Sequence, residues 1–472
     1  MLTMAAIITV LHLYRVLPMS DPVFTHSKEQ LQQFAQDVLR FAAEKGASGS
    51  SVQFSEGNGL SISVRKGSVE TIEQNKDKGM TVTVYLGEEG QVRRGNASTS
   101  NFSAKALKDT VEAAYNIARF TAPDDCAGLP DEDTIERDPR DLQLCTPWLV
   151  SAEDAVELAK RCEAAAFAVD RRITNSEGAS VSAQQSHFVS ANSRGFVGGY
   201  PYSRHTLSAA PIAGKGANMQ GGNWYSLQRD PRKLAAPEAI GRYAAERALA
   251  RLNARKLDTR KCPVLFEAPL AAGLVGAFVQ AISGGALYRK STFLLDSLGK
   301  QAMAKHLQII EDPHEVGSLG AAPFDEEGVR TVRRDVVKDG VVQGYFLSTY
   351  SARKLGMKTT GNASGSHQLK LTSTLTDPVD DFVAMLKKLD TGLLVTELMG
   401  QGVNYVTGDY SRGAAGYWVE NGVIQYPVEE ITIAGNMRDM LMQIVAVGSD
   451  TLRRGTRETG SILIESMTVA GN

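Results

Sequence analysis

The chain of 472 residues carries 51 lysine and arginine residues against 53 aspartate and glutamate residues, which gives a formal net charge of -2 at pH 7. This near balance supplies no broad basic field, so nucleic acid and anionic membranes are not expected partners. With 43% hydrophobic and 22% charged residues, the composition is typical of a soluble globular protein, and the length predicts two or three domains at roughly 150 residues each.

The first feature along the chain is an apolar run at residues 4–13. It is too short to span a bilayer, because a membrane helix needs about 20 residues. No basic segment precedes it and no small-residue cleavage site follows it, so a secretory leader is disfavoured. We expect residues 1–25 to be a non-conforming or disordered extension, with Met19 as an alternative start of translation.

The next segment alternates between helical and strand patterns. Ser27 and Gln30 have the spacing of a capping box and predict a helix that ends at Gly46. Residues 60–64 and 80–85 alternate with the period of two that is typical of half-buried strands. A hairpin partner at 91–94 and a helix from Ser103 follow, and the unit resembles an antiparallel sheet covered by helices.

Residues 123–150 change in composition, with several prolines and many acidic side chains, and we interpret them as an extended surface connector. A helix at 151–169, strands to about 210 and a helix at 237–252 are predicted beyond it. We therefore expect an N-terminal α/β domain at 26–235.

Residues 236–472 are expected to form a β-rich C-terminal domain, either a barrel or a sandwich. A short apolar strand at 262–266 precedes an apolar helix at 270–282, and strands dominate afterwards. The dipeptides Asp339-Gly340 and Asn421-Gly422 favour tight hairpins, because asparagine, aspartate and glycine tolerate positive φ. The fold class is α+β.

The cysteines do not form a disulfide framework or a C-x-x-C pair, since there are four of them, widely spaced: Cys126, Cys145, Cys162 and Cys262. We expect reduced thiols that behave as small hydrophobic side chains, as in a cytoplasmic protein.

Common catalytic motifs are absent from the sequence. There is no phosphate-binding P-loop, no dinucleotide fingerprint and no G-x-S-x-G elbow, although a serine paired with a distant histidine stays open. A helical zinc site needs two histidines about one turn apart. His306 and His314 are eight residues apart and straddle Pro313, and His314-Glu315 is followed by no second histidine.

Four segments carry a resemblance to a known family: 288–297 (YRKSTFLLDS), 349–356 (TYSARKLG), 397–403 (ELMGQGV) and 408–422 (GDYSRGAAGYWVENG). They resemble the TldD/PmbA family of metallopeptidases, in particular its PmbA branch, also called TldE. The resemblance covers the chain after about residue 25. It implies a heteromeric peptidase of TldD and TldE subunits that processes or degrades small unfolded peptides, including peptide precursors and antitoxins.

The TldD branch carries H-E-x-x-x-H on a helix shortly before an Arg-Lys pair, and a cysteine near the carboxyl end completes its zinc site. Here the pair is Arg289-Lys290, and the same interval places Gly276, Ala277 and Ala281 at the His, Glu and His positions. No cysteine follows Cys262. The resemblance therefore implies a chain without zinc or catalytic residues of its own, whose zinc lies in a TldD-like partner. The helix at 270–282 is then a packing surface.

Candidate contacts for a peptide or a partner remain. The glycine-rich stretch 400–416 contains Tyr410, Ser411 and Arg412, which we expect to line a peptide groove. Arg289 and Lys290 are candidates to pair with a peptide carboxylate or an acidic side chain of the partner.

Two other hypotheses stay open. The chain could be a stand-alone binding protein that modulates another machine such as DNA gyrase, or a metal-independent hydrolase that uses Ser291 or Ser411. A homodimer of the isolated chain is compatible with each hypothesis. The physiological peptide cannot be identified from the sequence.

Overall fold

The computed structural model describes residues 23–88 and 90–471. The chain divides into two compact units between Leu252 and Asn253. We expected the boundary at 235/236, but helix α4 (Pro237–Ala250) packs against helix α3 (Ala152–Phe167) and so belongs to the first unit.

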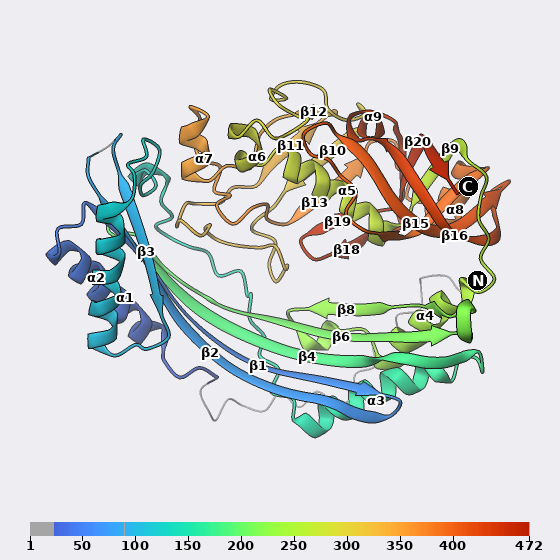
Figure 1. Cartoon of the computed structure of the whole chain (residues 1–472), viewed down its shortest axis with the longest axis horizontal. Coiled ribbons are helices and arrows are strands. Elements are labelled where there is room, and N and C mark those ends of the chain that lie inside the picture. Colours follow the sequence, from blue (N-terminus) through green and yellow to red (C-terminus); the bar gives the residue numbers. More distant parts are fainter. Residues whose placement is uncertain (1–22, 89, 472) are drawn as a thin grey trace. The chain divides into compact units, whose positions relative to one another are not determined.

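The first unit is built on a sheet that has eight strands in the described part of the chain, in the order β3-β2-β1-β4-β6-β7, with β5 paired to β4 and β8 paired to β6. The long strands lie side by side and bend along their length (Figure 1). Its further helices are α1 (Lys28–Glu44) and α2 (Ala104–Phe120), and its strands are β1 (Gly49–Arg65), β2 (Ser68–Leu86), β3 (Arg93–Thr99), β4 (Ile173–Asn192), β5 (Val197–Gly198), β6 (Pro201–Ala213), β7 (Gln220–Gly221) and β8 (Trp224–Gln228).

One face of this sheet is covered by all four helices. Val52 and Phe54 of β1 pack under α1 and α2, whereas Ile62 and Val64 pack under α3 and α4. Because alternate residues of a strand point to the same side, these four even-numbered residues share one face. The covered antiparallel sheet agrees with the expectation from the sequence.

The local signals of the first unit are confirmed, but the strands are longer than predicted. The Ser27 hydroxyl accepts the Gln30 N–H and the Gln30 side chain accepts the Ser27 N–H, which completes the capping box of α1. Strands β1 and β2 pair over almost their whole length, and they are joined at Lys66 and Gly67, both with positive φ. Polar residues and glycines in the middle of both strands interrupt the alternation on which the shorter predictions depended.

Two predicted irregular segments contribute to the core. Residues 1–22 of the expected extension lie outside the described residues, but the ring of Phe24 stacks on His187 with centroids 4.0 Å apart. The connector at 123–150 is extended, as predicted, with one 3-10 turn at Glu132–Thr134. It is not confined to the surface, because Leu142 and Trp148 are buried.

A buried carboxylate lies between the two helix-covered halves of this sheet. Glu56 accepts the backbone N–H of His26 at 3.0 Å, and its side chain also contacts the rings of His26 and His187. Burial by itself raises the pKa of Glu56, but the hydrogen bonds from the two histidines outweigh it, and the pKa is lower than usual.

The second unit contains a closed barrel of five strands in the order β16-β15-β14-β9-β20, closed by pairing of β16 with β20. The strands are β9 (Arg260–Phe266), β14 (Gly392–Met399), β15 (Asp409–Glu420), β16 (Val423–Asn436) and β20 (Ile462–Ala470), with β17 (Ile444–Val447) on β20. A barrel was one of the two predicted forms of this β-rich domain. The hairpin turns are also confirmed, since Asp339, Gly340, Asn421 and Gly422 all have positive φ.

A second sheet accompanies the barrel, in the order β12-β11-β10-β13-β19-β18. Its strands are β10 (Leu307–Glu311), β11 (Arg334–Lys338), β12 (Val341–Val342), β13 (Leu369–Ser373), β18 (Leu452–Arg454) and β19 (Arg457–Thr459). The helices of the unit are α5 (Ala268–Ala281), α6 (Gly284–Tyr288), α7 (Thr349–Lys354), α8 (Phe382–Leu389) and α9 (Met437–Met442).

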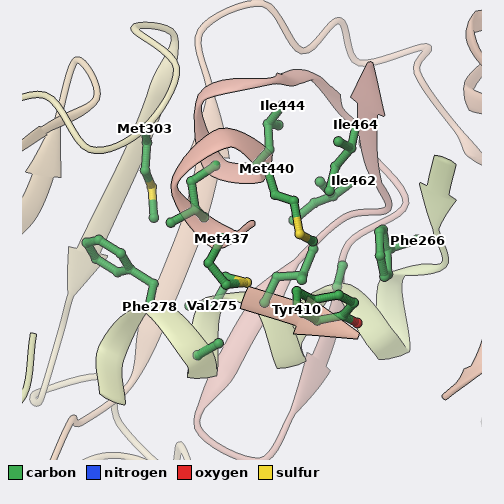
Figure 2. Packing of buried hydrophobic residues seen from close by; sticks show 14 of the residues in the cluster. Phe266, Val275, Phe278, Met303, Tyr410, Met437, Met440, Ile444, Ile462 and Ile464 are labelled. Atoms are coloured by element: carbon green, nitrogen blue, oxygen red, sulfur yellow. The ribbon is translucent and has the colours of Figure 1, made fainter. Parts of the chain in front are cut away.

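Helix α5 is the predicted apolar helix, and it is buried over most of its surface. Val275 and Phe278 of α5 belong to the same hydrophobic cluster as Phe266 of β9 and Met437 and Met440 of α9 (Figure 2). The helix thus joins the barrel core, as its composition indicates.

The four cysteines are free and mostly buried. Burial raises the pKa of the Cys145 thiol to about 11 and that of Cys162 to about 12, so these thiols stay protonated at neutral pH. Among the helices of the described residues, none combines the length and apolar character needed to cross a bilayer.

The Glu56 contacts predict a pH-dependent loss of stability. Glu56→Gln removes a buried hydrogen-bonded charge and should lower the free energy of unfolding at pH 7 by roughly 1–3 kcal/mol. Because the folded pKa of Glu56 is depressed, the stabilisation is present above the unfolded pKa and disappears as pH falls through the folded pKa. The gap between variant and wild-type melting temperatures should therefore narrow below about pH 4.5. Glu70→Gln, at an exposed strand position, is the control, and a gap independent of pH contradicts the prediction.

The close packing of the barrel strands can be tested at Gly416 of β15. A Cβ at Gly416 would lie 1.8 Å from the carbonyl oxygen of Leu394 on β14, so Gly416→Ala must separate paired strands. We expect a loss of roughly 1–3 kcal/mol, measured by thermal melting. Gly273→Ala is the matched control, because no atom lies within 4 Å of that Cβ and alanine favours a helix interior. Equal melting temperatures for the two variants would show that the β14–β15 contact is not tight.

Candidate functional site

A pocket of about 400 Å³ lies in the second unit between helix α5 and the segment that joins β14 to β15. Its wall combines apolar side chains, glycines and a few polar groups. The lining residues are Pro269, Leu270, Gly273, Leu274, Ala277, Leu398, Gly400, Gln401, Gly402, Val403, Tyr405, Tyr410 and Arg412.

Helix α5 carries the three positions that the family resemblance assigns to metal ligands and the general base, and one of them lines the pocket. Ala277 lines the pocket with a side chain that has no donor atom. Ala281 is fully buried, and its carbonyl oxygen accepts the hydroxyl of Thr292 at 2.6 Å. Because glycine and alanine offer a metal no side-chain lone pair, Gly276, Ala277 and Ala281 do not fit a zinc ion.

A cationic side chain lies against the first of these positions. A Cβ added to Gly276 would be 2.9 Å from Nη1 and 3.0 Å from Cζ of Arg457, which comes from strand β19. The guanidinium therefore lies over the helix where it has no side chain. Burial lowers the pKa of Arg457, and Tyr405 acts in the opposite direction. A positive charge at this place further opposes a metal cation.

A second arginine is positioned by another glycine. Arg412 of β15 lines the pocket, and a Cβ at Gly402 would lie 2.3 Å from its Cγ and 1.9 Å from the carbonyl oxygen of Ser411. The side chain of Arg412 can thus lie along the β14–β15 segment only because residue 402 is glycine. The Nε atoms of Arg412 and Arg457 are both buried and have no hydrogen-bond partner among the described residues.

Two tyrosines complete the polar part of the site. Tyr410 is 3% exposed, and burial raises its pKa to about 12 despite the neighbouring Arg412 guanidinium. Its hydroxyl lies near Arg412 but forms no hydrogen bond of ordinary geometry. Burial also raises the pKa of Tyr405, while Arg457 and Arg412 act in the opposite direction. Both phenols therefore remain protonated at neutral pH and can donate a hydrogen bond.

The arrangement has the chemistry of an anion site. The pocket wall contains no aspartate, glutamate, histidine, cysteine or serine, so it offers no general base or nucleophile among its lining residues. It does offer guanidinium and phenol donors. Such donors can hold a negatively charged group or polarise a carbonyl oxygen.

The structure brings only some of the predicted site residues together. Tyr410 and Arg412 line the pocket with Ala277, whereas Ser411 is exposed and does not line it. Arg289 and Lys290 are also exposed outside it, after helix α6, where Arg289 donates to the Tyr288 hydroxyl at 3.1 Å. They remain candidates for contact with a partner.

The serine hypothesis gains no support from the hydrogen bonds. The Ser291 hydroxyl donates to the Ala286 carbonyl oxygen at 3.4 Å. Neither Ser291 nor Ser411 is hydrogen-bonded to a histidine in the described part of the chain. A nucleophilic serine needs such a base within reach.

Tyr405 and Arg457 were not identified from the sequence. Tyr405 lies inside the stretch 400–416 that was singled out, but it carries no motif of its own. Arg457 is remote in sequence from the pocket residues, and it reaches α5 because β19 packs against that helix. The position of Tyr405 in that glycine-rich stretch could have suggested the tyrosine, whereas no local signal in the sequence indicates the arginine.

Two places in the first unit also bring polar side chains together. A larger hollow of about 540 Å³ includes Glu163, but its carboxylate already accepts the N–H groups of Lys66 and Gly67. The ligand atoms of Asp124, Asp125 and Cys126 lie within 4.8 Å of one another. Asp124 accepts the backbone N–H of Cys126, as in an Asx turn, and the cluster carries no further argument.

Comparison with solved structures identifies the same architecture elsewhere. A proposed modulator of DNA gyrase from Bacteroides thetaiotaomicron superposes with a TM-score of 0.88 at 27% identity, and the match covers 94% of this chain and 100% of that chain. TldE from Thermococcus kodakarensis superposes with a TM-score of 0.80, covering 93% and 100%. At 20% identity, the second match is a likeness of fold alone.

Sequence comparison identifies the family. Models of the PmbA/TldA metallopeptidase domains match residues 51–118 (domain 1), 145–252 (central domain) and 259–471 (C-terminal domain). Metalloprotease PmbA of Escherichia coli O157:H7 is 48% identical over 441 residues, covering 93% of this chain and 96% of that protein. A Metalloprotease PmbA homolog of Haemophilus influenzae is 44% identical, covering 96% and 99%. The chain therefore belongs to the PmbA/TldD family of metallopeptidases, within its PmbA (TldE) branch.

Proposed function

We propose that this chain is the metal-free subunit of a TldD/TldE-type zinc metallopeptidase, which processes or degrades small unfolded peptides together with a TldD-like catalytic subunit. The observation that carries the proposal is the replacement of metal-ligating side chains on α5. Gly276, Ala277 and Ala281 supply no ligand, and the Arg457 guanidinium lies against the first of them.

The rest of the scaffold supports a role within a complex. The chain has a closed five-stranded barrel and a helix-covered antiparallel sheet, although the catalytic side chains implied by the resemblance are missing. A chain that keeps a folded scaffold without catalytic groups is well suited to complete a site on another chain. In this proposal the zinc and the activated water belong to the partner.

The proposed compartment is the reducing cytoplasm. The four free cysteines support it, since two of them have thiols with raised pKa values and none is paired in a disulfide. Membrane lipid and nucleic acid are not part of the proposal, because the net charge is -2.

Reconstitution with a catalytic subunit tests the proposal. The purified chain should contain well under one zinc per chain and leave an unstructured test peptide intact. Addition of a TldD-like chain should produce cleavage that a chelator abolishes, because the partner supplies the metal. Elemental analysis and mass spectrometry of the peptide make the measurements.

A TldD-like chain with its His-Glu residues replaced by alanine is the control and should give no cleavage. One zinc per isolated chain, or chelator-resistant cleavage by this chain alone, would contradict the proposal. Recovery of a topoisomerase without any TldD-like chain in a pull-down would favour the modulator hypothesis instead.

A second test addresses the exposed arginine after helix α6. If Arg289 contacts an acidic group of the partner, Arg289→Glu should weaken the complex by about tenfold, equivalent to roughly 1.4 kcal/mol, and leave the melting temperature unchanged. Arg438→Glu, at another exposed arginine of the same unit, is the matched control. Titration by light scattering or calorimetry measures the affinity, and equal losses for both variants would indicate a non-specific effect of charge.

A further inference from the structure

Two arginines lie at or beside the pocket next to α5. Arg412 lines the pocket, and Arg457 lies against Gly276, the neighbour of the lining residue Ala277. The Nε atoms of Arg412 and Arg457 are buried without a hydrogen-bond partner among the described residues. No carboxylate lines the pocket. Buried donors without partners are costly, and in native proteins they are rare enough to require an explanation.

Both arginine side chains occupy space that a glycine leaves open. Gly276 leaves room for the guanidinium of Arg457, and Gly402 leaves room for the stem of Arg412. A Cβ at Gly402 would collide with the stem of Arg412 and with the Ser411 carbonyl oxygen, whereas a Cβ at Gly276 would make the terminal atoms of Arg457 shift. The backbone at these two glycines therefore leaves the space that the two arginine side chains occupy.

Both guanidinium groups act on the phenol of Tyr405, and Arg412 also acts on that of Tyr410. The pKa of Tyr405 responds to both Arg457 and Arg412, so its phenol lies within the field of the two guanidinium groups. Tyr410 adds a buried hydroxyl next to Arg412 that has no partner of its own. These groups together present hydrogen-bond donors and positive charge to one small region.

The remainder of the wall is apolar. Leu270, Leu274, Leu398 and Val403 contribute aliphatic surface, and the volume of about 400 Å³ is near the lower end of small-ligand pockets. A matching ligand carries one anionic group and a compact apolar part. A planar carboxylate suits guanidinium donors because its two oxygens accept parallel hydrogen bonds.

We propose that this pocket binds a carboxylate attached to a small apolar group, with Arg412 and Arg457 as its cationic partners and the phenols of Tyr405 and Tyr410 as additional donors. In a peptide, the C-terminal carboxylate of an aliphatic residue has this chemistry, and so does an acidic side chain. The peptide as the source rests on the proposed function, whereas the carboxylate site itself does not.

Binding of short probes to the isolated full chain tests the assignment. N-acetyl-alanyl-leucine with a free carboxylate should bind saturably in calorimetry or saturation-transfer NMR. Its C-terminal amide should bind at least about tenfold more weakly, because the charge is removed and the guanidinium donors are left unpaired. N-acetyl-aspartyl amide presents the carboxylate on a side chain, and binding as tight as that of the first probe would support the site and assign it to acidic residues.

Variants separate the pocket from the rest of the surface. Arg412→Gln and Arg457→Gln should each weaken binding of N-acetyl-alanyl-leucine by about tenfold or more. Gly273→Leu should fill the pocket and abolish binding without unfolding α5, since an added Cβ meets no atom within 4 Å. Arg438→Gln, an exposed arginine outside the pocket, should bind as the wild type does. Melting curves establish that each variant is folded.

Three results would overturn the carboxylate assignment. They are absence of saturable binding by the wild-type chain, equal affinity for the acid and the amide, and displacement of the acid by inorganic phosphate at lower concentration than by acetate. Each measurement uses this chain alone. A failure to reconstitute peptidase activity would therefore count against the proposed function and leave the binding result standing.

Discussion

The second unit depends on glycines at which a backbone segment comes closer to its neighbours than a Cβ would allow. Gly416 allows β15 to lie against the Leu394 carbonyl oxygen of β14, and this pairing is part of the closed barrel. Gly402 allows the same closeness to the Ser411 carbonyl oxygen and the stem of Arg412 at the pocket, and Gly276 allows it to the guanidinium of Arg457. The glycine content of the sequence is thus used for packing as well as for turns.

This packing decides what chemistry the unit can support. A zinc ligand on α5 would need space and a donor atom, yet residue 276 faces a guanidinium and residue 281 is fully buried. The side chains at these positions thus offer a cation no donor atom, and a guanidinium lies beside them. An electropositive, partly apolar pocket favours binding of an anionic group over activation of water, because none of its lining residues can accept a proton from water at neutral pH.

Signals between neighbouring residues predicted helix starts and hairpin turns. The features that the sequence did not predict depend on contacts between residues far apart in the chain. The capping box at Ser27 and the hairpin dipeptide at Asn421 depend on neighbouring residues, so both could be identified. The full length of β1 and β2 could not, since glycines and polar residues hide the alternation in their middle. Tyr410 and Arg412 were identified as candidates because they lie in the glycine-rich stretch 400–416. Arg457 was not, because only the packing of β19 on α5 brings it to the pocket.

The resemblance and the geometry contribute different parts of the argument. The resemblance alone identifies an absence, namely the missing histidines and glutamate. The geometry adds a positive feature at the same place, because Arg457 lies where a ligand side chain at residue 276 would project. A scaffold without a metal could have filled this space with aliphatic side chains, which are cheaper to bury than a partly buried guanidinium whose Nε has no hydrogen-bond partner among the described residues. The buried charge is therefore better explained by something that the pocket receives than by the stability of the fold.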